Sequence, residues 1–218
     1  MEMSHELAER PVARTPCTRP ASTSQLVEPL VARLLDEVDV GLAVIDAQAR
    51  VLLANRAAHR ESAQGGRWHV DDGIARPVHA VDAPAFGRAL RAAVAGLRSL
   101  ATFAGEDGQD AGHVAFIPLA PAIDATPLVL LLFGRQQVCG PLGVQFFARQ
   151  HGVTLAESWV LAALCDGRTP RGIAQQRGIA LSTVRSQISN IRQKTGARSI
   201  PDLLRTVSKL PPLVSIEA

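Results

Sequence analysis

The feature that most restricts the fold of this chain is a series of helix start and stop signals between residues 153 and 196. Thr154 and Glu157 form the T-x-x-E pattern of a capping box ahead of an apolar run, which Gly167 ends. Residues 169–178, TPRGIAQQRG, repeat the arrangement with a capping threonine, a proline at the first helical position and a terminal glycine. A short turn then leads into 182–196, STVRSQISNIRQKTG. Two short helices, a turn and a longer helix predict a helix-turn-helix.

The third of these helices has no acidic residue on its polar face. At about 100° per residue, Val184, Ile188 and Ile191 form a narrow apolar stripe that should face the preceding helices. Short polar side chains flanked by cations suit the major groove of DNA, because they allow close approach to base edges and phosphates. The alternative is an ordinary solvated face. The polar face consists of Ser182, Ser186, Ser189 and Gln193 at its centre, Arg185 and Arg192 on one side, and Thr183, Asn190 and Lys194 on the other.

The distribution of charge supports a polyanion-binding end. Residues 151–218 hold nine basic and four acidic side chains, a net charge of +5, whereas the whole chain carries only +3. Residues 1–150 are therefore mildly acidic, at −2. A basic end on an acidic body indicates a separate nucleic-acid-binding domain.

Residues 153–197 resemble the LuxR-type helix-turn-helix of bacterial transcription regulators. The resemblance implies an all-α DNA-binding domain over 151–218 that binds duplex DNA as a homodimer on two half-sites. The matching positions are Thr154, Glu157, Leu161, Gly167, Ile173, Ala174, Gly178, Ile179, Thr183, Val184, Asn190, Ile191, Lys194 and Gly196.

The resemblance also implies individual roles on the third helix. It places Arg185, Ser186 and Ser189 against bases, and Thr183 and Lys194 against phosphates. With the rest of the polar face, the predicted DNA-binding set is Thr183, Arg185, Ser186, Ser189, Asn190, Arg192, Gln193 and Lys194.

Three positions depart from the family pattern. Ala180 stands where a capping serine is usual, so the third helix should lack a side-chain N-cap. Gly172 replaces a usual glutamate inside the second helix, and Gln187 stands where histidine is common.

Residues 25–135 show a different periodicity and predict an α+β domain with an antiparallel sheet. Strands are expected at 42–45, 50–53, 112–120 and 127–133, the last uniformly apolar as a central strand should be. Asn55 should cap a helix that follows the second strand, and 83–100 should be helical. Pro29 is suited to a first turn, so a further helix is expected from about Glu28 to Val38, either packed on its own sheet or forming a dimer contact.

The stretch GLAVIDAQARVLLANRAA at 41–58 resembles the opening of a PAS domain, through Gly41, Val44, Asp46, Val51 and Asn55. Ala49 stands where glycine is usual. The resemblance implies a PAS-like domain that senses an unidentified small-molecule ligand or dimerises. No cofactor or metal is predicted. The histidines that could bind haem are isolated from one another: His59, His69, His79 and His113.

The remaining segments complete the expected layout. Residues 1–24 should be a disordered tail, and 136–150 a glycine-rich linker between the domains. The longest apolar run, 127–133, is far shorter than the roughly 20 residues of a membrane span, so a cytoplasmic protein without membrane contact is expected. Cys17, Cys139 and Cys165 have no metal-ligand spacing and are expected to be inert.

Three other functions compete with a DNA-binding transcription regulator, for which RNA polymerase would be a further candidate partner. A protein–protein module, such as an anti-activator, could keep the fold after losing DNA binding. A sigma-factor-like protein would need an all-helical domain in place of the strands at 28–135. An enzyme is disfavoured, because the sequence offers no paired nucleophile and base, no phosphate loop and no metal cluster.

Overall fold

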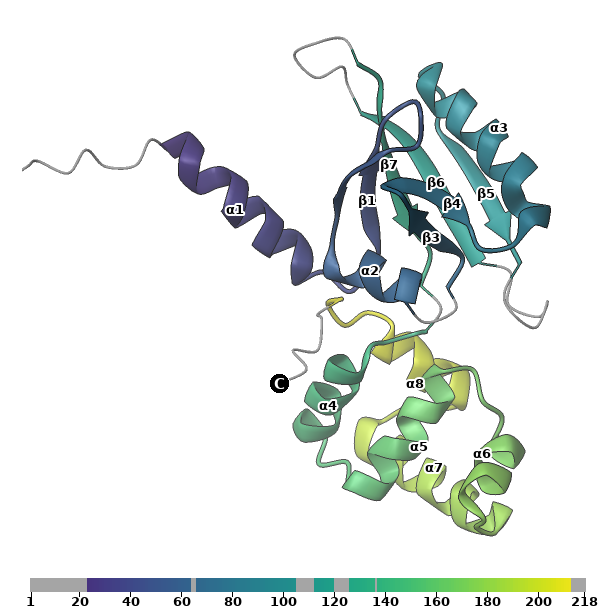
Figure 1. Ribbon diagram of the computed structural model, residues 1–218. Coiled ribbons are helices and arrows are strands. Elements are labelled where there is room, and N and C mark those ends of the chain that lie inside the picture. The colour runs from purple at the N-terminus through teal and green to yellow at the C-terminus, as the bar shows by residue number, and fades with distance from the viewer. Residues whose placement is uncertain (1–22, 64–65, 105–111, 120–125, 136, 213–218) are drawn as a thin grey trace, which may run out of the picture.

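The computed structural model describes residues 23–63, 66–104, 112–119, 126–135 and 137–212, which form two domains (Figure 1). The expected tail at 1–24 lies outside the described residues up to residue 22, and its last two residues belong to the first helix. The N-terminal elements are α1 (Thr23–Asp36), β1 (Leu42–Ile45), β2 (Val51–Ala54), α2 (Arg56–Ala63), β3 (Trp68–Asp71), β4 (Ile74–Pro77), a 3₁₀ turn (Ala80–Asp82), α3 (Ala83–Val94), β5 (Ser99–Phe103), β6 (Gly112–Leu119) and β7 (Leu128–Phe133). The C-terminal elements are α4 (Pro141–Gln150), α5 (Leu155–Cys165), α6 (Pro170–Arg177), α7 (Leu181–Thr195) and α8 (Ile200–Val207).

The N-terminal domain is built on a five-stranded antiparallel sheet in the order β2-β1-β7-β6-β5, beside the hairpin β3-β4. This confirms the expected α+β domain with an antiparallel sheet and contradicts the all-helical domain that the sigma-factor-like alternative required. The apolar strand β7 lies at the centre of the sheet, as its composition predicted. Fully buried and half-buried residues alternate along it, because successive side chains point to opposite faces.

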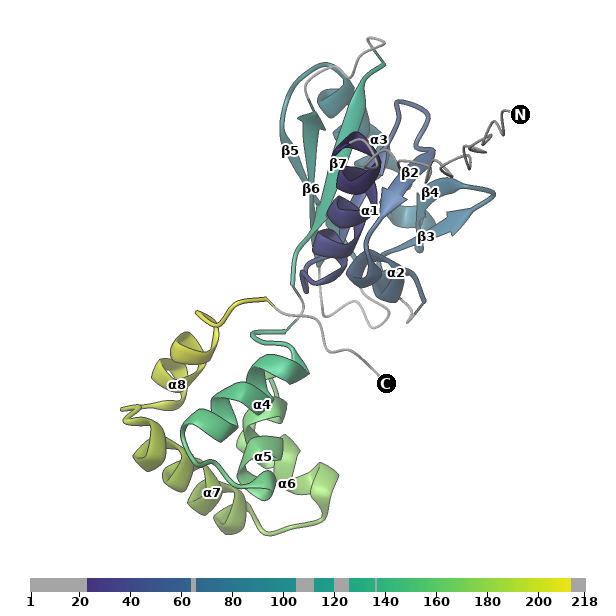
Figure 2. The ribbon, with the colours of Figure 1, turned by 90° about the vertical axis from the view of Figure 1, so that its left-hand side faces the viewer.

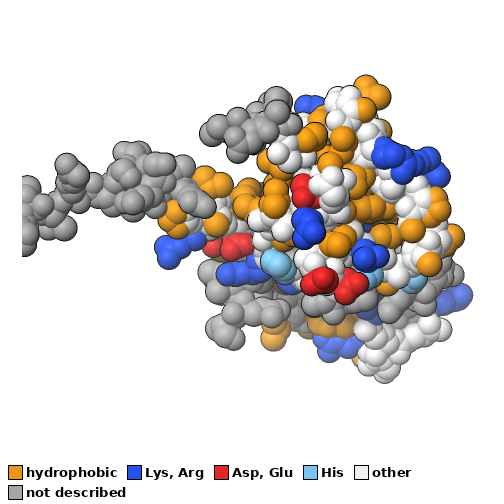
Figure 3. Space-filling model, turned by 45° about the horizontal axis from the view of Figure 1, so that its top comes forward, with side chains coloured by type: hydrophobic (Ala, Val, Ile, Leu, Met, Phe, Trp, Pro, Cys, Tyr) orange, Lys and Arg blue, Asp and Glu red, His pale blue; other side chains and the backbone are white. Residues whose placement is uncertain are grey.

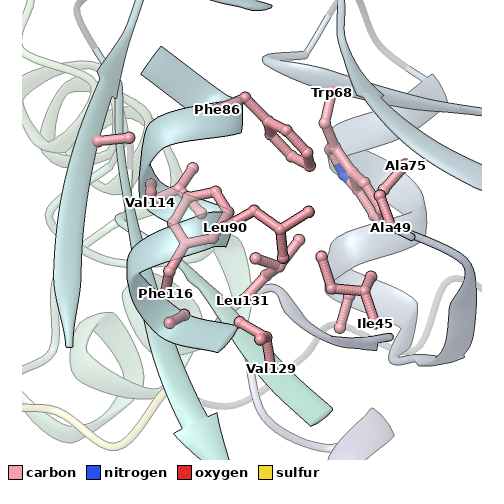
Figure 4. Packing of buried hydrophobic residues seen from close by; sticks show 14 of the residues in the cluster. Ile45, Ala49, Trp68, Ala75, Phe86, Leu90, Val114, Phe116, Val129 and Leu131 are labelled. Atoms are coloured by element: carbon pink, nitrogen blue, oxygen red, sulfur yellow. The ribbon is translucent and has the colours of Figure 1, made fainter. Parts of the chain in front are cut away.

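The core of this domain lies between the sheet and α3 (Figure 4). Phe86 of α3 meets Phe116 of β6 edge to face, with ring centroids 5.3 Å apart. Trp68 packs against Phe133 of β7 at 5.0 Å, and its indole N–H donates to the Ala58 carbonyl. These aromatic contacts join α2, α3, the hairpin and the sheet into one core.

Asn55 does more than the predicted capping. Its Oδ1 accepts from the Ala58 amide of α2 and from the Leu42 amide of β1, both at 2.9 Å. Its Nδ2 donates to the carbonyls of Leu35 and Val40, also at 2.9 Å. Because Asn55 is 1% exposed, these bonds satisfy a buried amide and tie the end of α1 to β1 and α2.

Ala49 explains why a glycine is usual in the β1–β2 turn. Its φ is 64°, in the left-handed region that a Cβ atom disfavours. The Asp46 carboxylate stabilises the turn by accepting from the amides of Gln48 and Arg50, each at 2.8 Å. The departure is tolerated at a cost of order 1 kcal/mol for the strained residue.

Four local expectations for secondary structure were wrong. The first helix begins at Thr23 with Pro29 inside it, since proline removes only one backbone donor and the flanking turns remain. The helix expected over 83–100 ends at Val94, and Ser99 belongs to the edge strand β5. The hairpin β3-β4, which turns at Asp72-Gly73, was not predicted. The expected linker at 136–150 is too long, because 141–150 form α4.

The helix α4 belongs to the C-terminal domain. Its residues Val144, Phe147 and Ala148 are buried in the same cluster as residues of α5, α6, α7 and α8. Gly143, which suggested a flexible junction, is required for close packing instead: a Cβ atom there would collide with the Cys139 sulfur. In Figure 2 the five C-terminal helices form one unit beside the sheet domain.

Two of the three cysteines lie in this unit. Cys139 and Cys165 are free and buried. Burial, reinforced by the neighbouring Cys139 and Asp166, raises the pKa of the Cys165 thiol to about 12, so its reactive thiolate is suppressed at neutral pH. Cys17 lies outside the described residues. No helix in the described part of the chain is long and apolar enough to cross a bilayer.

Candidate nucleic-acid interface

The helix-turn-helix consists of α6, a turn and α7, and local signals set its boundaries. Thr169 caps α6 by accepting from the Gly172 amide at 3.2 Å, so Gly172 still supplies the donor that the cap needs. Gly178 ends α6 with φ 62°, and Gly196 ends α7 with φ 73°, the left-handed conformation that glycine adopts without strain. The helix boundaries therefore agree with the sequence pattern.

The apolar stripe of α7 is buried as predicted. Val184 and Ile191 are fully buried and Ile188 is 5% exposed, in the cluster that α5 and α8 complete. Burial of this stripe fixes the rotation of α7, so the opposite face must point to solvent. Of the predicted DNA-binding residues, those exposed on that face are Thr183, Arg185, Ser186, Ser189, Asn190, Gln193 and Lys194.

Lys194 is held within the domain rather than left free. Its ammonium lies 2.6 Å from the Glu157 carboxylate, and Glu157 is 5% exposed. Glu157 also completes the capping box of α5: its Oε2 accepts from the Thr154 amide at 2.8 Å, and its own amide donates to the Thr154 hydroxyl. One carboxylate thus joins the start of α5 to the end of α7. The T-x-x-E pattern predicted the cap but gave no sign of the ion pair.

Arg192 is likewise engaged inside the domain. It is half-buried, and its guanidinium donates to the carbonyls of Ala197 and Arg198, just beyond the end of α7. A cation in this place donates hydrogen bonds to carbonyls that the helix end leaves unpaired, and it interacts favourably with the negative end of the helix dipole. Arg192 therefore closes the turn between α7 and α8 in this structure.

The structure brings the other six predicted residues together on one exposed surface. Within the described part of the chain, their side chains have no hydrogen-bond or ion-pair partner. Arg185 is the only cation among the six, with short hydroxyl and amide side chains around it. This surface, named the α7 face below, consists of Thr183, Arg185, Ser186, Ser189, Asn190 and Gln193.

Two further contacts near the helix-turn-helix were missed from the sequence. The Arg177 guanidinium, at the end of α6, lies 3.8 Å from the centroid of the Trp159 ring of α5. Gln187 is half-buried, and its Oε1 has no partner among the described residues. The sequence carried no signal for either, because each depends on how the helices pack.

The Glu157–Lys194 pair should make stability depend on pH. Burial acts to raise the pKa of Glu157, but the hydrogen bond from Lys194 and those with Thr154 outweigh it, so the pKa lies below its ordinary value. The Glu157 carboxylate therefore contributes its full stabilisation to the folded domain above the unfolded carboxyl pKa of about 4.3. This stabilisation is lost as pH falls through the lower pKa of the folded state. We expect the difference in thermal midpoint between wild type and Glu157→Gln to shrink below about pH 4.3. Glutamine keeps the capping box and removes only the charge, so a difference that stays constant down to pH 3 would contradict this role.

The N-terminus of α7 offers a stabilising substitution. Ala180 occupies the N-cap with extended backbone angles and provides no side-chain acceptor. Serine at this position should accept a hydrogen bond from the amide of Thr183 and raise stability by about 0.5–2 kcal/mol. Thermal unfolding of Ala180→Ser should give a higher midpoint than wild type, whereas Ala180→Gly should shift it by much less. An unchanged midpoint in the serine variant would show that the cap is not needed.

In this helix-turn-helix, burial of one face of α7 leaves the opposite face, with its polar side chains and Arg185, exposed to solvent. This arrangement is that of a DNA-binding domain. Residues 153–207 match the family model described as bacterial regulatory proteins, luxR family. The C-terminal domain is therefore a LuxR-type helix-turn-helix domain, as the sequence resemblance indicated. No curated protein matches the chain.

Solved structures resemble the chain at low sequence identity. A phage VqmA–DPO complex is 17% identical with a TM-score of 0.39, over 87% of this chain and 91% of that one. A Vibrio cholerae VqmA–ligand–DNA complex is 20% identical with a TM-score of 0.38, over 86% of this chain and 91% of that one. A PAS domain of a two-component sensor histidine kinase is 11% identical with a TM-score of 0.37, over 51% of this chain and 98% of that one.

Proposed function

We propose that this chain is a homodimeric bacterial transcription regulator that binds duplex DNA through the α7 face. The observation that carries the proposal is the pairing of a buried apolar stripe with an opposite face of six polar side chains that have no partner in the described chain. Such a face can approach base edges closely, and Arg185 can reach guanine or a phosphate. Four of these residues have assigned roles: Arg185, Ser186 and Ser189 contact bases, and Thr183 contacts a phosphate.

Lys194 and Arg192 take positioning roles in this proposal. The Glu157 carboxylate holds the Lys194 ammonium at the end of α7, where its remaining donors can still face a phosphate. Arg192 fixes the turn after α7 through two carbonyls. Both side chains therefore set the angle at which the α7 face meets DNA.

Homodimerisation is assigned to α1. This helix projects from the sheet domain (Figure 1), and hydrophobic side chains lie on its surface (Figure 3). Its apolar residues Leu30, Val31 and Leu34 are 54%, 43% and 59% exposed. A helix with an exposed apolar face gains most by packing against a second copy, which buries the same face on both protomers. Two recognition helices held this way would address two half-sites.

The remaining parts of the proposal follow from this role. A regulator of bacterial genes acts in the cytoplasm, where RNA polymerase is a candidate partner, and the PAS-like domain would respond to a small-molecule ligand. No enzymatic activity is proposed, because the α7 face offers binding groups and no paired nucleophile and base.

Selection of binding sites from a random duplex library with the full-length protein tests the proposal. We expect a two-fold symmetric consensus, complexes that contain two protomers by native mass spectrometry, and affinity that falls with salt by a slope of about −0.9 per phosphate contact. No enriched sequence together with a flat salt dependence would contradict DNA binding and favour the protein–protein alternative.

A further inference from the structure

A polar cavity of about 340 Å³ lies where the sheet domain meets the segment leading into α4. Its walls come from the approach to β1, from α2, from the end of β7 and from the start of α4. It borders the core of the sheet domain at Phe133 and is separate from the α7 face. Its size is at the lower end of the range for small-molecule sites, roughly 300–1,000 Å³.

Two guanidinium groups line this cavity, and a third is bonded to residues of its wall. Arg60 lines it and pairs with Asp39 at 2.7 Å. Arg67, 3% exposed, does not line the cavity but pairs at 3.0 Å with Glu61, which does. Arg135 lines the cavity and has no carboxylate partner within the described part of the chain. Three cations against two carboxylates leave one positive charge without compensation.

Arg60 and Arg67 each keep one nitrogen without an acceptor. The Nε atoms of Arg60 and Arg67 are both buried and have no acceptor among the described residues. Each guanidinium directs another nitrogen to a partner: Arg60 to Asp39, and Arg67 to Glu61 and the Gly134 carbonyl at 2.9 Å. The two Nε atoms are closed off from solvent, so the groups that a bound oxyanion can reach are the Arg135 guanidinium and the exposed part of Arg60, whose side chain is 39% exposed.

The lining also includes apolar side chains, those of Val40, Ala57 and Phe133. A ligand that matches both kinds of lining has one negatively charged, planar oxyanion and a short apolar body. A monocarboxylate meets this description: its two oxygens suit the guanidinium fork, and its single charge balances the local excess.

We propose that this cavity is a binding site for a small monocarboxylate, with the carboxylate on Arg135 and Arg60 and the apolar part against Phe133. This assigns a ligand class to the sensory role in the proposed function, on which it builds. Because the site includes both the end of β7 and the first residues of α4, an occupied cavity would connect the sheet domain to the DNA-binding domain.

Calorimetric titration of the full-length protein in chloride buffer without DNA tests the site, with benzoate as the probe and benzamide as its neutral counterpart of similar shape. We expect saturable binding of one benzoate per protomer, and binding of benzamide weaker by at least about tenfold, the loss of one charge-assisted interaction. Inorganic phosphate, which lacks an apolar part, should also bind more weakly than benzoate.

Two variants locate the binding. Arg135→Gln removes the unpaired charge at an exposed position, and Gln137→Trp enlarges an exposed side chain of the lining without changing charge. Both should weaken benzoate binding at least about tenfold. Arg88→Gln, on the exposed surface of α3, is the charge-matched control and should bind like wild type.

Absence of saturable benzoate binding would overturn the proposal. So would equal binding of benzoate and benzamide, equal binding of phosphate, or unchanged affinity in both cavity variants. If Arg88→Gln lost as much benzoate affinity as the cavity variants, the binding would reflect general charge attraction, and the proposal would also be overturned. Because the titration contains no DNA, these outcomes are independent of whether the α7 face binds an operator.

Discussion

Arg185→Ala is expected to weaken binding of the selected DNA site by about 1–3 kcal/mol, roughly 5- to 150-fold. Arg185 is exposed at the side of the α7 face and is its only cation without an intramolecular partner in the described chain. Its removal deletes donors to guanine or phosphate without disturbing the buried stripe. The variant should therefore fold normally, with an unchanged thermal midpoint.

The pattern of the loss identifies which contact Arg185 makes. If the guanidinium reads a base, the variant should lose preference at one position of each half-site while the salt dependence changes little. If it contacts a phosphate, affinity should fall for all sequences and the salt slope should decrease by about one. Fluorescence anisotropy across site variants and salt concentrations distinguishes these results.

Arg88→Ala is the control for the loss of one positive charge. Arg88 is exposed on α3 in the other domain, so its removal changes the net charge equally but touches no part of the α7 face. We expect its DNA affinity to match that of wild type. Wild-type affinity in Arg185→Ala would show that α7 does not dock through this side.

Ile191→Ala should lower the free energy of unfolding of the C-terminal domain by about 2–5 kcal/mol. Ile191 is fully buried in α7, so alanine there loses the transfer energy of the deleted atoms and leaves a cavity among α5, α7 and α8. Because Val184 and Ile191 define the buried stripe, the variant should also lose DNA binding as the rotation of α7 becomes less well fixed.

Hydrogen exchange measured peptide by peptide separates the two domains in this experiment. We expect faster exchange throughout 155–207 in Ile191→Ala and little change in β6 and β7, since each domain has its own hydrophobic cluster. Leu155→Ala is the matched control, because Leu155 is 88% exposed and its truncation creates no cavity. Equal destabilisation by the two substitutions would contradict the buried role of Ile191.

Local patterns were sufficient to predict the helix-turn-helix. The capping box at Thr154, the threonine cap of α6 and the terminal glycines all act between residues a few positions apart. The same holds for Asn55, whose predicted cap of α2 is confirmed. The stripe of α7 was predictable because a period of 3.6 residues places its members on one side.

Prediction failed where the outcome depends on distant partners. The hairpin β3-β4 was missed although its turn, Asp72-Gly73 with φ 49° and 77°, is a local hairpin signal. What the sequence did not indicate is that this hairpin packs on the sheet domain's core through Trp68 and Ala75. Residues 99 and 100 could extend a helix, but pairing with Phe116 and Ala115 of β6 holds them in a strand. Gly143 suggested a linker, although its lack of a side chain serves close packing on Cys139.

The sequence by itself determined where the helices of the C-terminal domain begin and end, which face of α7 is buried, and the alternation of the central strands. These properties depend on hydrogen bonds and periodicities that operate within a few residues. Only the tertiary structure decided that Lys194 is paired with Glu157, 37 residues away, and that a cavity forms between segments near residues 39, 60 and 135. Charges and donors that are far apart in the chain interact only after packing brings them together, because their attraction in water is weak at longer range.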